Sequence, residues 1–487
     1  MKRTIILATL LTFVAVCFTP NLYSAEKRSK RQTEGVINVS SLEELLPYLK
    51  KDNVTLTMTP GTYRVTPADI KANKFPDHSE VREGEKKNVL LLVTANNSSY
   101  DFTGVTVEVE SAVFNSFENR GELHDLHLLG SNNTIKNIKF VDVGKPTDVP
   151  QFGCTNIAID GANNLVEGVE VHSQGSYPYG YGSLFGIGGK NVIRHRKHCA
   201  CLLRGDNNHL KNCKFYHNAF GHFIFMQGAQ NPTIEGCYTE GKMNTTDNVL
   251  AEKGTGSAAD KVGFMTFYGY VTPPGYTFPI GEDGIRTYAS GNTMIDGVRY
   301  SSRETGGKIV VKDCVVKHAR RGISLAHGGG DKYVENCTLI GCKSGYSVND
   351  GGQIVNCRAD AAFGPAIWIF SNNTRNVTAD ITIIPYEGEP YTGNKSGQAA
   401  VIAGRNNNIT LRKGKGFKNE GDLAIYVGGD CKALGHLNGD NNNPAHNNTI
   451  INKTGLPVIV DDNTSGNIIT TNGEYTDEGT NNTITAK

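Results

Sequence analysis

The feature that most limits the fold of this sequence is a short unit that recurs along most of its length. In each copy, a turn rich in asparagine or glycine leads into a short strand with alternating apolar residues. Clear copies begin at Asn132, Asn163, Asn207, Asn231, Gly307, Asp331 and Gly352, and looser ones at Asn407, Asn447, Asn467 and Asn481. A fixed period in the twenties, built from strands and Asn/Gly turns, is typical of a solenoid.

Cysteines make the period visible. Cys213 and Cys237 are 24 residues apart, Cys314 and Cys337 are 23 apart, and Cys337 and Cys357 are 20 apart. No helical pattern long enough for a leucine-rich or ankyrin repeat lies between the strands, so the strands must coil and stack on one another. We predict that equivalent positions form one interior column, namely Ile138, Val169, Cys213, Cys237, Cys314, Cys337 and Cys357.

This pattern resembles the right-handed parallel β-helix of pectate-lyase-like carbohydrate-active proteins, over about residues 55–487. We therefore predict an all-β chain that forms a single right-handed parallel β-helix solenoid with a short N-terminal capping helix. Residues 26–54 form the lead-in and cap in this interpretation. Ser41 and Glu44 have capping-box spacing, and Pro47 interrupts the helix. Such a helix would cover the open edge of the first coil.

The N-terminus has a basic start at residues 1–3 and an apolar run at 4–19, which predicts a signal peptide over residues 1–25. The run is too short for a membrane span, and Val16 before Cys17 argues against a lipoprotein. We expect a secreted or periplasmic protein. Its compartment permits disulfides, yet most remaining cysteines share one repeat position, so we expect buried free thiols. Cys199 and Cys201 are expected to share one strand face.

Residues 172–306 depart from the repeat and are expected to carry the active-site loops. Residues 175–182 are glycine-rich and aromatic, and residues 242–283 form the longest stretch without a repeat signature. Long loops on a rigid scaffold are usually functional or disordered, and this one is too aromatic for a disordered linker. We interpret it as a wall of an active site.

Positive charge is concentrated beside these loops. The chain has a formal net charge of only +1, so no global field favours nucleic acid or a membrane. Between residues 190 and 222, however, Asp206 is the only acid. The lysines, arginines and histidines in this range are Lys190, Arg194, His195, Arg196, Lys197, His198, Arg204, His209, Lys211, Lys214, His217 and His222. This cluster indicates a cleft for an anionic oligosaccharide, and the alternative is a solvated basic face. We expect a monomer that binds neither nucleic acid nor membrane.

Aligning the repeats on their closing glycines gives a second clue. Arg204, Gln227, His327 and Asp350 fall in equivalent places, and Arg286 matches Ser324 at an outward position. If the strand register were off by one residue, the Arg286 side chain would point to the opposite face of the sheet. Hydrogen bonding within turns is the alternative interpretation of this column.

The chemistry follows from the substrate class. Arginine grips carboxylate or sulfate with a planar fork, which favours sugars bearing uronic acids with or without sulfate. The natural reaction of a uronate is β-elimination: a base removes the C5 proton, a cation neutralises the carboxylate, and an acid assists the C4 oxygen to leave. Elimination within a chain is a lyase reaction, and loss of a free C4 hydroxyl is a dehydration.

Candidate roles can be assigned on this basis. His195, His198 and His222 are candidates for base or acid, Arg204 and Arg286 for neutralising the carboxylate, and Lys253 for either role. Residues predicted to bind the substrate are Tyr179, Tyr181, Tyr268, Arg303 and His327. No metal or other cofactor is predicted, because the tight Asp-x-Asp run of a calcium site is missing, although calcium assists some lyases of this fold.

Three segments sharpen the resemblance: residues 252–255, the aromatic loop at 264–276, and residues 282–286. They are similar to the ulvan oligosaccharide dehydratases of ulvan-degradation systems. That resemblance implies secretion, an anionic oligosaccharide with a non-reducing-end glucuronate or iduronate beside sulfated rhamnose, and a 4,5-unsaturated uronate as product. No catalytic motif of that family transfers residue by residue.

Other functions remain open. A polysaccharide lyase would use the same elimination, whereas a glycoside hydrolase normally needs two carboxyl groups beside the bond. Acids are present at Asp206, Glu240, Glu252, Glu282, Asp283 and Glu304, but the polygalacturonase signatures and the Arg-x-Pro-x-x-Arg pattern of classical pectate lyases are missing. A non-catalytic glycan-binding protein would predict uniform coils, unlike this histidine-rich centre.

Overall fold

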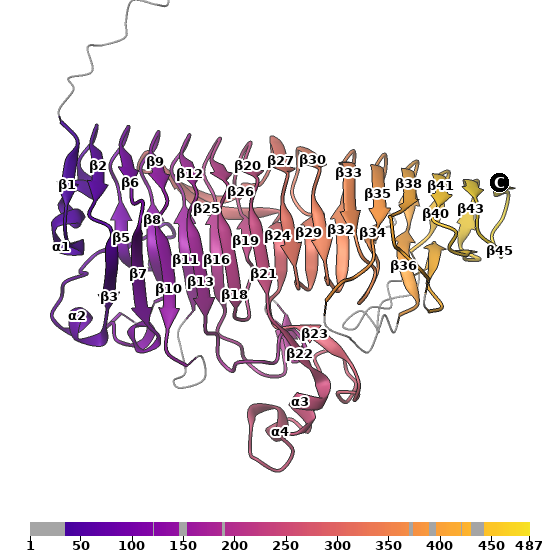
Figure 1. The fold of residues 1–487 in the computed structure, drawn as a ribbon, viewed down its shortest axis with the longest axis horizontal. Helices are drawn as coiled ribbons and strands as arrows, with labels where there is room; N and C mark the ends of the chain where they lie inside the picture. Colours follow the sequence, from indigo (N-terminus) through magenta and orange to yellow (C-terminus); the bar gives the residue numbers. More distant parts are fainter. Residues whose placement is uncertain are drawn as a thin grey trace, which may run out of the picture. The chain divides into compact units, whose positions relative to one another are not determined.

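The computed structural model describes residues 35–119, 121–145, 153–187, 190–369, 374–388, 396–419, 421–429 and 443–487. Residues 36–487 form one unit of stacked coils whose strands pair in parallel within two large sheets (Figure 1). The predicted all-β solenoid is therefore confirmed. The predicted signal peptide lies outside the described residues. No helix in the described ranges is long and apolar enough to cross a membrane.

The smaller of the two large sheets has 14 strands, and all of its neighbouring pairs are parallel except β4 with β5. Its strands are β4 (His78–Ser79), β5 (Lys87–Val93), β8 (Leu123–Leu128), β11 (Cys154–Ile159), β16 (His198–Leu203), β19 (Ile224–Met226), β24 (Asp283–Thr287), β29 (Arg321–Leu325), β32 (Ser344–Val348), β34 (Ile367–Ile369), β36 (Gln398–Ile402), β39 (Ala424–Val427), β42 (Val458–Val460) and β45 (Tyr475–Asp477).

The larger sheet has 23 strands. They are β1 (Ile37–Val39), β2 (Thr55–Met58), β3 (Gly61–Val65), β6 (Ser99–Asp101), β7 (Val105–Glu110), β9 (Thr134–Lys136), β10 (Lys139–Val143), β12 (Leu165–Glu167), β13 (Glu170–Gln174), β17 (His209–Lys211), β18 (Lys214–Asn218), β20 (Thr233–Glu235), β21 (Tyr238–Gly241), β27 (Lys308–Lys312), β28 (Val315–Lys317), β30 (Asp331–Glu335), β31 (Thr338–Ile340), β33 (Gln353–Ala359), β35 (Thr378–Ile383), β38 (Asn408–Lys413), β41 (Thr449–Lys453), β44 (Ile468–Thr471) and β46 (Thr483–Ala486). A short third sheet joins β37 (Gly404–Arg405), β40 (Ala445–His446) and β43 (Thr464–Ser465).

The predicted interior column is confirmed, and its corner geometry explains the sequence pattern. The residue before each column member has a left-handed backbone with φ between 50° and 66°, a conformation that asparagine and glycine tolerate well. The column members are buried to 1% exposure or less. Each cysteine thiol of the column lies near the carbonyl of a residue one coil earlier, as Cys237 does with Leu210 O at 3.7 Å. All nine cysteines in the described ranges are buried and free, as predicted.

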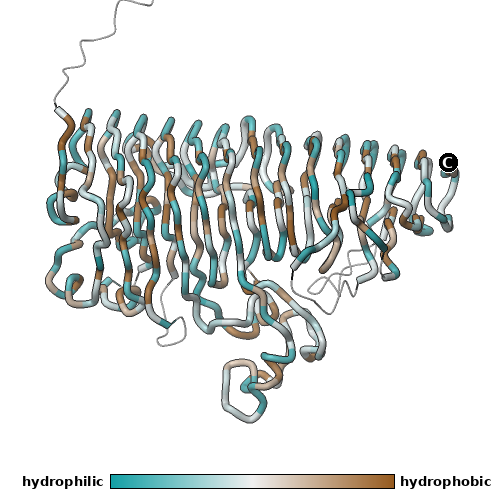
Figure 2. Tube along the Cα trace, in the orientation of Figure 1, coloured by the Kyte–Doolittle hydropathy of each residue, from teal (hydrophilic) through white to brown (hydrophobic). Residues whose placement is uncertain are grey.

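A ladder of buried asparagines holds the other corner. The backbone N–H of Asn133 donates to Asn164 Oδ1 at 2.8 Å, and the backbone N–H of Asn164 donates to Asn208 Oδ1 at 3.0 Å. The same arrangement recurs near the C-terminus from Asn407 to Asn448. These side chains satisfy backbone groups that would otherwise be buried without a partner. Figure 2 shows the result, with hydrophilic turns along one edge of the coils and apolar residues within the strands.

The capping helix is present as predicted. The Ser41 side chain accepts from the backbone N–H of Glu44 at the start of α1 (Leu42–Leu45), and η1 (Leu46–Lys50) follows with Pro47 near its start. The parallel sheet begins earlier than predicted, because β1 pairs with β2 ahead of residue 55. Two further short helices, α2 (Pro67–Lys71) and η2 (Ser111–Asn115), lie between the early strands.

Residues 172–306 leave the coils in three places. The first is the short hairpin of β14 (Gly186–Ile187) and β15 (Lys190–Asn191). The second runs from β22 (Met243–Thr245) through α3 (Thr246–Leu250) and α4 (Ala258–Lys261) to β23 (Thr277–Pro279). The third is the antiparallel hairpin of β25 (Ser290–Ile295) and β26 (Val298–Glu304).

Candidate active site

A cavity of about 300 Å³ opens on the outward face of the 14-stranded sheet. Side chains of β8, β11, β16 and β19 line it, the segment from Val81 to Lys87 contributes further lining residues, and Asn292 of β25 joins them. The lining residues are Val81, Arg82, Glu85, Lys87, Glu122, His124, Cys154, Thr155, Lys197, Cys199, Leu202, Arg204, His222, Phe225, Gln227, Tyr288 and Asn292. The predicted cationic cluster therefore contributes Lys197, Arg204 and His222 to one cavity.

Strand β16 shows how the cavity obtains its side chains. Ala200, Cys201 and Leu203 belong to the hydrophobic core, whereas Cys199 and Leu202 face outward and line the cavity. Two consecutive inward residues break the alternation of a regular strand. The prediction that Cys199 and Cys201 share a face was wrong for this reason. The same break places Arg204, one residue after β16, on the outward side.

His222 and Tyr288 form the central polar contact. His222 Nε2 lies 2.6 Å from the Tyr288 hydroxyl oxygen, and the backbone N–H of Asp283 donates to His222 Nδ1 at 3.4 Å. Burial lowers the pKa of His222 to about 3, so the ring is neutral near pH 7. Because Nδ1 accepts a hydrogen bond, the single ring proton lies on Nε2 and is donated to Tyr288. The hydroxyl hydrogen of Tyr288 is then free to point into the cavity.

The surroundings of Tyr288 act on its phenol in opposite directions. Burial, followed by the carboxylate of Glu282, raises the pKa of Tyr288 above its usual value, and the Arg286 guanidinium offsets only part of that rise. The central carbon of that guanidinium lies 4.5 Å from the centre of the tyrosine ring. A cation over the ring and an N–H donor at the oxygen both favour the phenolate, the form that can accept a proton.

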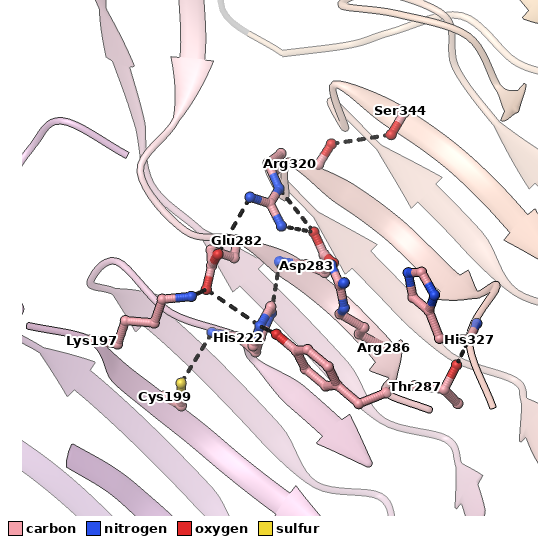
Figure 3. Close-up of polar contacts among 11 residues, drawn as sticks. Lys197, Cys199, His222, Glu282, Asp283, Arg286, Thr287, Arg320, His327 and Ser344 are labelled. Carbon is pink, nitrogen blue, oxygen red and sulfur yellow. Dashed lines mark hydrogen bonds and ion pairs between the residues drawn. The ribbon is translucent and has the colours of Figure 1, made fainter. Parts of the chain in front are cut away.

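Two buried carboxylates hold the cations around this pair (Figure 3). Glu282 Oε2 lies 2.6 Å from Lys197 Nζ and 3.3 Å from His222 Nε2. Burial alone would raise the pKa of Glu282, but His222, Lys197 and Arg320 hold it well below its usual value. Asp283 pairs with Arg286 and accepts two hydrogen bonds from Arg320, at 2.9 and 3.1 Å. Both acids are therefore ionised and serve as anchors for cations.

Arg204 is anchored by a separate buried acid. Its Nη2 lies 2.5 Å from Asp160 Oδ2, and His127 Nε2 lies 2.7 Å from the same oxygen. Thr293 of β25 donates to Asp160 Oδ1 at 3.0 Å, so the acid also fixes the hairpin to the sheet. Burial opposes ionisation, but Arg204 and His127 lower the pKa of Asp160 to about 2. Arg204 lines the cavity with its fork held in place.

Two predicted residues lie beside the cavity. Arg286 pairs with Ser324 across β24 and β29, as the sequence alignment predicted. His327 lies near Arg286, which lowers its pKa together with the larger effect of burial (Figure 3). The repeat alignment was wrong by one residue at His327 and at Asp350. Met226 pairs with Thr287, so Gln227 falls beside Tyr288, and His327 falls one residue beyond that row.

Three other predicted catalytic residues are placed differently. His198 faces the interior, with Nε2 3.2 Å from Asp142 Oδ2, because it begins β16 on the inward side. The ring of His195 packs on the ring of Phe220, with ring centres 4.5 Å apart, and does not line the cavity. Burial lowers the pKa of His195 to about 4. Lys253 is exposed in the turn after α3 and is not among the residues that line the cavity.

The predicted sugar-binding tyrosines support the loops. Tyr179 donates to Asn218, and Tyr181 donates to Glu252 at 2.6 Å from within a small apolar cluster. Tyr268 stacks on Tyr270 with ring centres 6.1 Å apart. Arg303 of β26 lies 2.6 Å from Asp206 Oδ1. None of these four predicted residues is among those that line the cavity.

Sequence reasoning included Lys197 in the cationic cluster but gave it no individual role, and it missed Tyr288 and His124 as site residues. Tyr288 lies two positions after Arg286, so the alternation of a strand puts both on the same face. The two-residue spacing between Arg286 and Tyr288 could therefore have identified Tyr288 as a site residue from the sequence. His124 donates from Nδ1 to the Thr155 carbonyl at 2.8 Å, and its position on β8 had no marker in the repeat. Within the described ranges, no three His, Cys, Asp or Glu side chains are arranged to hold a metal ion.

The comparison with protein-family models agrees with the solenoid. The family model "Right handed beta helix region" matches residues 185–412. No curated protein sequence matches the chain significantly. Similar solved structures include an alginate lyase in complex with G6, at 14% identity over 92% of this chain and 87% of that chain, with a TM-score of 0.36. A rhamnogalacturonan lyase is 13% identical over 74% of this chain and 75% of that chain, with a TM-score of 0.33. The A-module of an Azotobacter vinelandii mannuronan C-5 epimerase is 10% identical over 93% of this chain and 95% of that chain, with a TM-score of 0.31.

Proposed function

We propose that the protein is a carbon–oxygen lyase that acts by β-elimination on uronic acid residues of an anionic oligosaccharide. The observation that carries this proposal is the 2.6 Å contact between His222 Nε2 and the Tyr288 hydroxyl, in a cavity that also holds Lys197 and Arg204. A proton-transfer group next to cations is the arrangement that elimination from a uronate requires.

Tyr288 performs both proton transfers in this mechanism. Its phenolate removes the proton at C5, the electron pair of that C–H bond forms the C4–C5 double bond, and the C4–O bond breaks. The new phenol then gives its proton to the departing oxygen, which regenerates the phenolate. His222 donates its Nε2 proton to the phenolate oxygen throughout, and Arg286 lies over the ring. Both contacts stabilise the charged form of Tyr288.

Arg204 and Lys197 supply the positive charge that the intermediate needs. Removal of the C5 proton spreads negative charge onto the substrate carboxylate, and a planar guanidinium matches that group with two parallel hydrogen bonds. Arg204 lines the cavity, and its Nε is buried without a hydrogen-bond partner in the described structure. Lys197 reaches the cavity from the other side, where Glu282 holds its ammonium group.

The lining of the cavity favours a terminal sugar. Residues of the 81–87 segment and Asn292 of the β25–β26 hairpin line it together with the sheet, and its volume of about 300 Å³ is at the lower limit for ligand pockets. A non-reducing-end uronate with a free C4 hydroxyl fits such a site, and its elimination expels water. We therefore propose a dehydratase of ulvan-type oligosaccharides, with Arg286 and His327 contacting the neighbouring sulfated sugar.

A glycoside hydrolase is less well supported by the same cavity. Hydrolysis with two carboxyl groups needs one that is protonated at the working pH, and burial is the usual way to achieve this. Within the described ranges, the carboxyls whose pKa is raised are Asp125, Asp142 and Asp360, and none of them lines the cavity. Glu85 and Glu122 line it but form ion pairs with Lys87.

The test uses uronate-containing oligosaccharides, including ulvan fragments, and follows both ultraviolet absorbance and product mass. New absorbance from a conjugated C4–C5 double bond with loss of one water supports the dehydratase. New absorbance with shorter products supports a chain-cleaving lyase at the same site. Shorter products without absorbance would replace elimination by hydrolysis, and no change on any anionic substrate would remove the enzymatic proposal.

A further inference from the structure

A second cavity, of about 580 Å³, lies on the 23-stranded sheet, whereas the candidate active site lies on the 14-stranded one. It is formed where successive strands β21, β28, β31, β33, β35 and β38 end. Its lining residues are Glu240, Lys317, His318, Ile340, Arg358, Thr382, Ile384, Pro385, Tyr386, Glu387, Gly388, Gly414 and Lys415. None of them belongs to the proposed catalytic machinery.

Three cations of this cavity have no carboxylate partner in the described parts of the chain. Lys317, Arg358 and Lys415 form no ion pair there, although other surface cations do, as Arg412 does with Asp380 at 2.7 Å. The ammonium of Lys317 lies 5.2 Å from the ring centre of Tyr238, which positions it without neutralising it. An unneutralised cation in a concave site raises the local concentration of anions.

The neighbouring groups favour a sugar ligand. His318 Nε2 and the Tyr386 hydroxyl are 3.2 Å apart, so two adjacent aromatic rings line the cavity. Burial lowers the pKa of His318, which keeps it neutral near pH 7. Glu240, which accepts from Tyr238 at 2.5 Å, and Glu387 are the acids of the lining. Carboxylates accept hydrogen bonds from sugar hydroxyls, but they repel a dense row of phosphates.

The spacing of the cations follows the coils. Lys317 ends β28, Arg358 lies two coils later in β33, and Lys415 follows β38 after two further coils. Adjacent strands are about 4.8 Å apart, so the cations are separated by roughly 10 Å along the solenoid. A chain in which alternate sugars carry a charge presents anions at a comparable repeat.

We propose that this second cavity is a binding site for an anionic glycan, in which Lys317, Arg358 and Lys415 contact carboxylates or sulfates of alternate sugars. The site binds a segment of polysaccharide several sugars long and converts none of it. Its existence does not depend on the reaction proposed for the first cavity, because binding is measured whether or not turnover occurs.

The test measures binding of the full chain to four probes: polygalacturonate, dextran sulfate, neutral dextran and single-stranded DNA. The background carries Tyr288→Phe so that no probe is consumed. The test variant combines Lys317→Ala, Arg358→Ala and Lys415→Ala. A matched control combines Lys51→Ala, Lys261→Ala and Lys308→Ala, which removes the same charge from exposed lysines outside both cavities.

We expect the test variant to bind polygalacturonate or dextran sulfate at least about tenfold more weakly than its parent, and the control to stay within about twofold. Loss on one probe alone assigns carboxylate or sulfate as the preferred anion. Neutral dextran should not bind. The proposal is overturned if the test variant binds like its parent, if the control loses as much affinity, or if DNA binds as tightly as the glycans through the same three residues.

Discussion

The substitution Tyr288→Phe removes one oxygen from the candidate active site and leaves the ring in place. The ring keeps its contacts with Phe225, whose centre is 6.3 Å away, and with Arg286. His222 Nε2 loses its partner at 2.6 Å but still has Glu282 Oε2 at 3.3 Å. We therefore expect a change in unfolding free energy of about 1 kcal/mol or less.

The expected loss of activity is much larger. Positioned proton transfer contributes about 10²- to 10⁴-fold, which corresponds to about 3–5 kcal/mol in the activation free energy. We expect kcat/KM for formation of the unsaturated product to fall by that factor, measured by absorbance on the best uronate oligosaccharide. Tyr475→Phe, at an exposed tyrosine of β45, serves as the control and should keep wild-type activity. A Tyr288→Phe enzyme with more than about one third of wild-type kcat/KM would refute the role of the phenol.

Three further outcomes follow from the structure. Arg286→Met removes the cation that lowers the pKa of Tyr288, so activity near neutral pH should fall and the alkaline rise of the pH–rate profile should move to higher pH; an unchanged profile would contradict the phenolate mechanism. The folded pKa of Asp160 is about 2, below its unfolded value, so its contribution of about 2 kcal/mol is present above about pH 4 and is lost as the pH falls toward 2. Urea unfolding of wild type and Asp160→Asn should show the larger difference at neutral pH, and equal differences at pH 7 and pH 2 would argue against this linkage. Asn164→Ala leaves the buried backbone N–H of Asn133 without its partner and should lower the unfolding free energy by about 1–3 kcal/mol at unchanged kcat. A loss of activity without destabilisation would contradict the structural role of the asparagine ladder.

The solenoid was predictable because its signal repeats. Each copy supplies the same left-handed corner and the same interior position, so the column from Ile138 to Cys357 could be read from spacing alone. The capping helix was predictable from Ser41 and Glu44 because a cap depends on local sequence. Repetition also averages out errors in single copies, which made the fold a safer prediction than any one residue in it.

The site was less predictable because it depends on strand phase and on loops. Two consecutive inward residues in β16 put Cys199 in the cavity and Cys201 in the core, and no periodic rule anticipates that break. His198 resembles a cationic site residue in the sequence, yet it lies inside the solenoid beside Asp142. Arg204 and His222 were found from the local excess of charge. Tyr288 was missed because substrate-binding tyrosines were predicted only in the aromatic loops, whereas Tyr288 directly follows strand β24.

The most direct test of the central claim is the fate of solvent oxygen during turnover. The reaction is run in water enriched in oxygen-18 on uronate oligosaccharides with reduced ends, quenched early, and followed by absorbance and product mass. β-Elimination by Tyr288 predicts new absorbance and no label from solvent in the product, because the C4–O bond breaks without attack by water. Labelled products without absorbance would show that water attacks the sugar, and would contradict elimination as the reaction of this site.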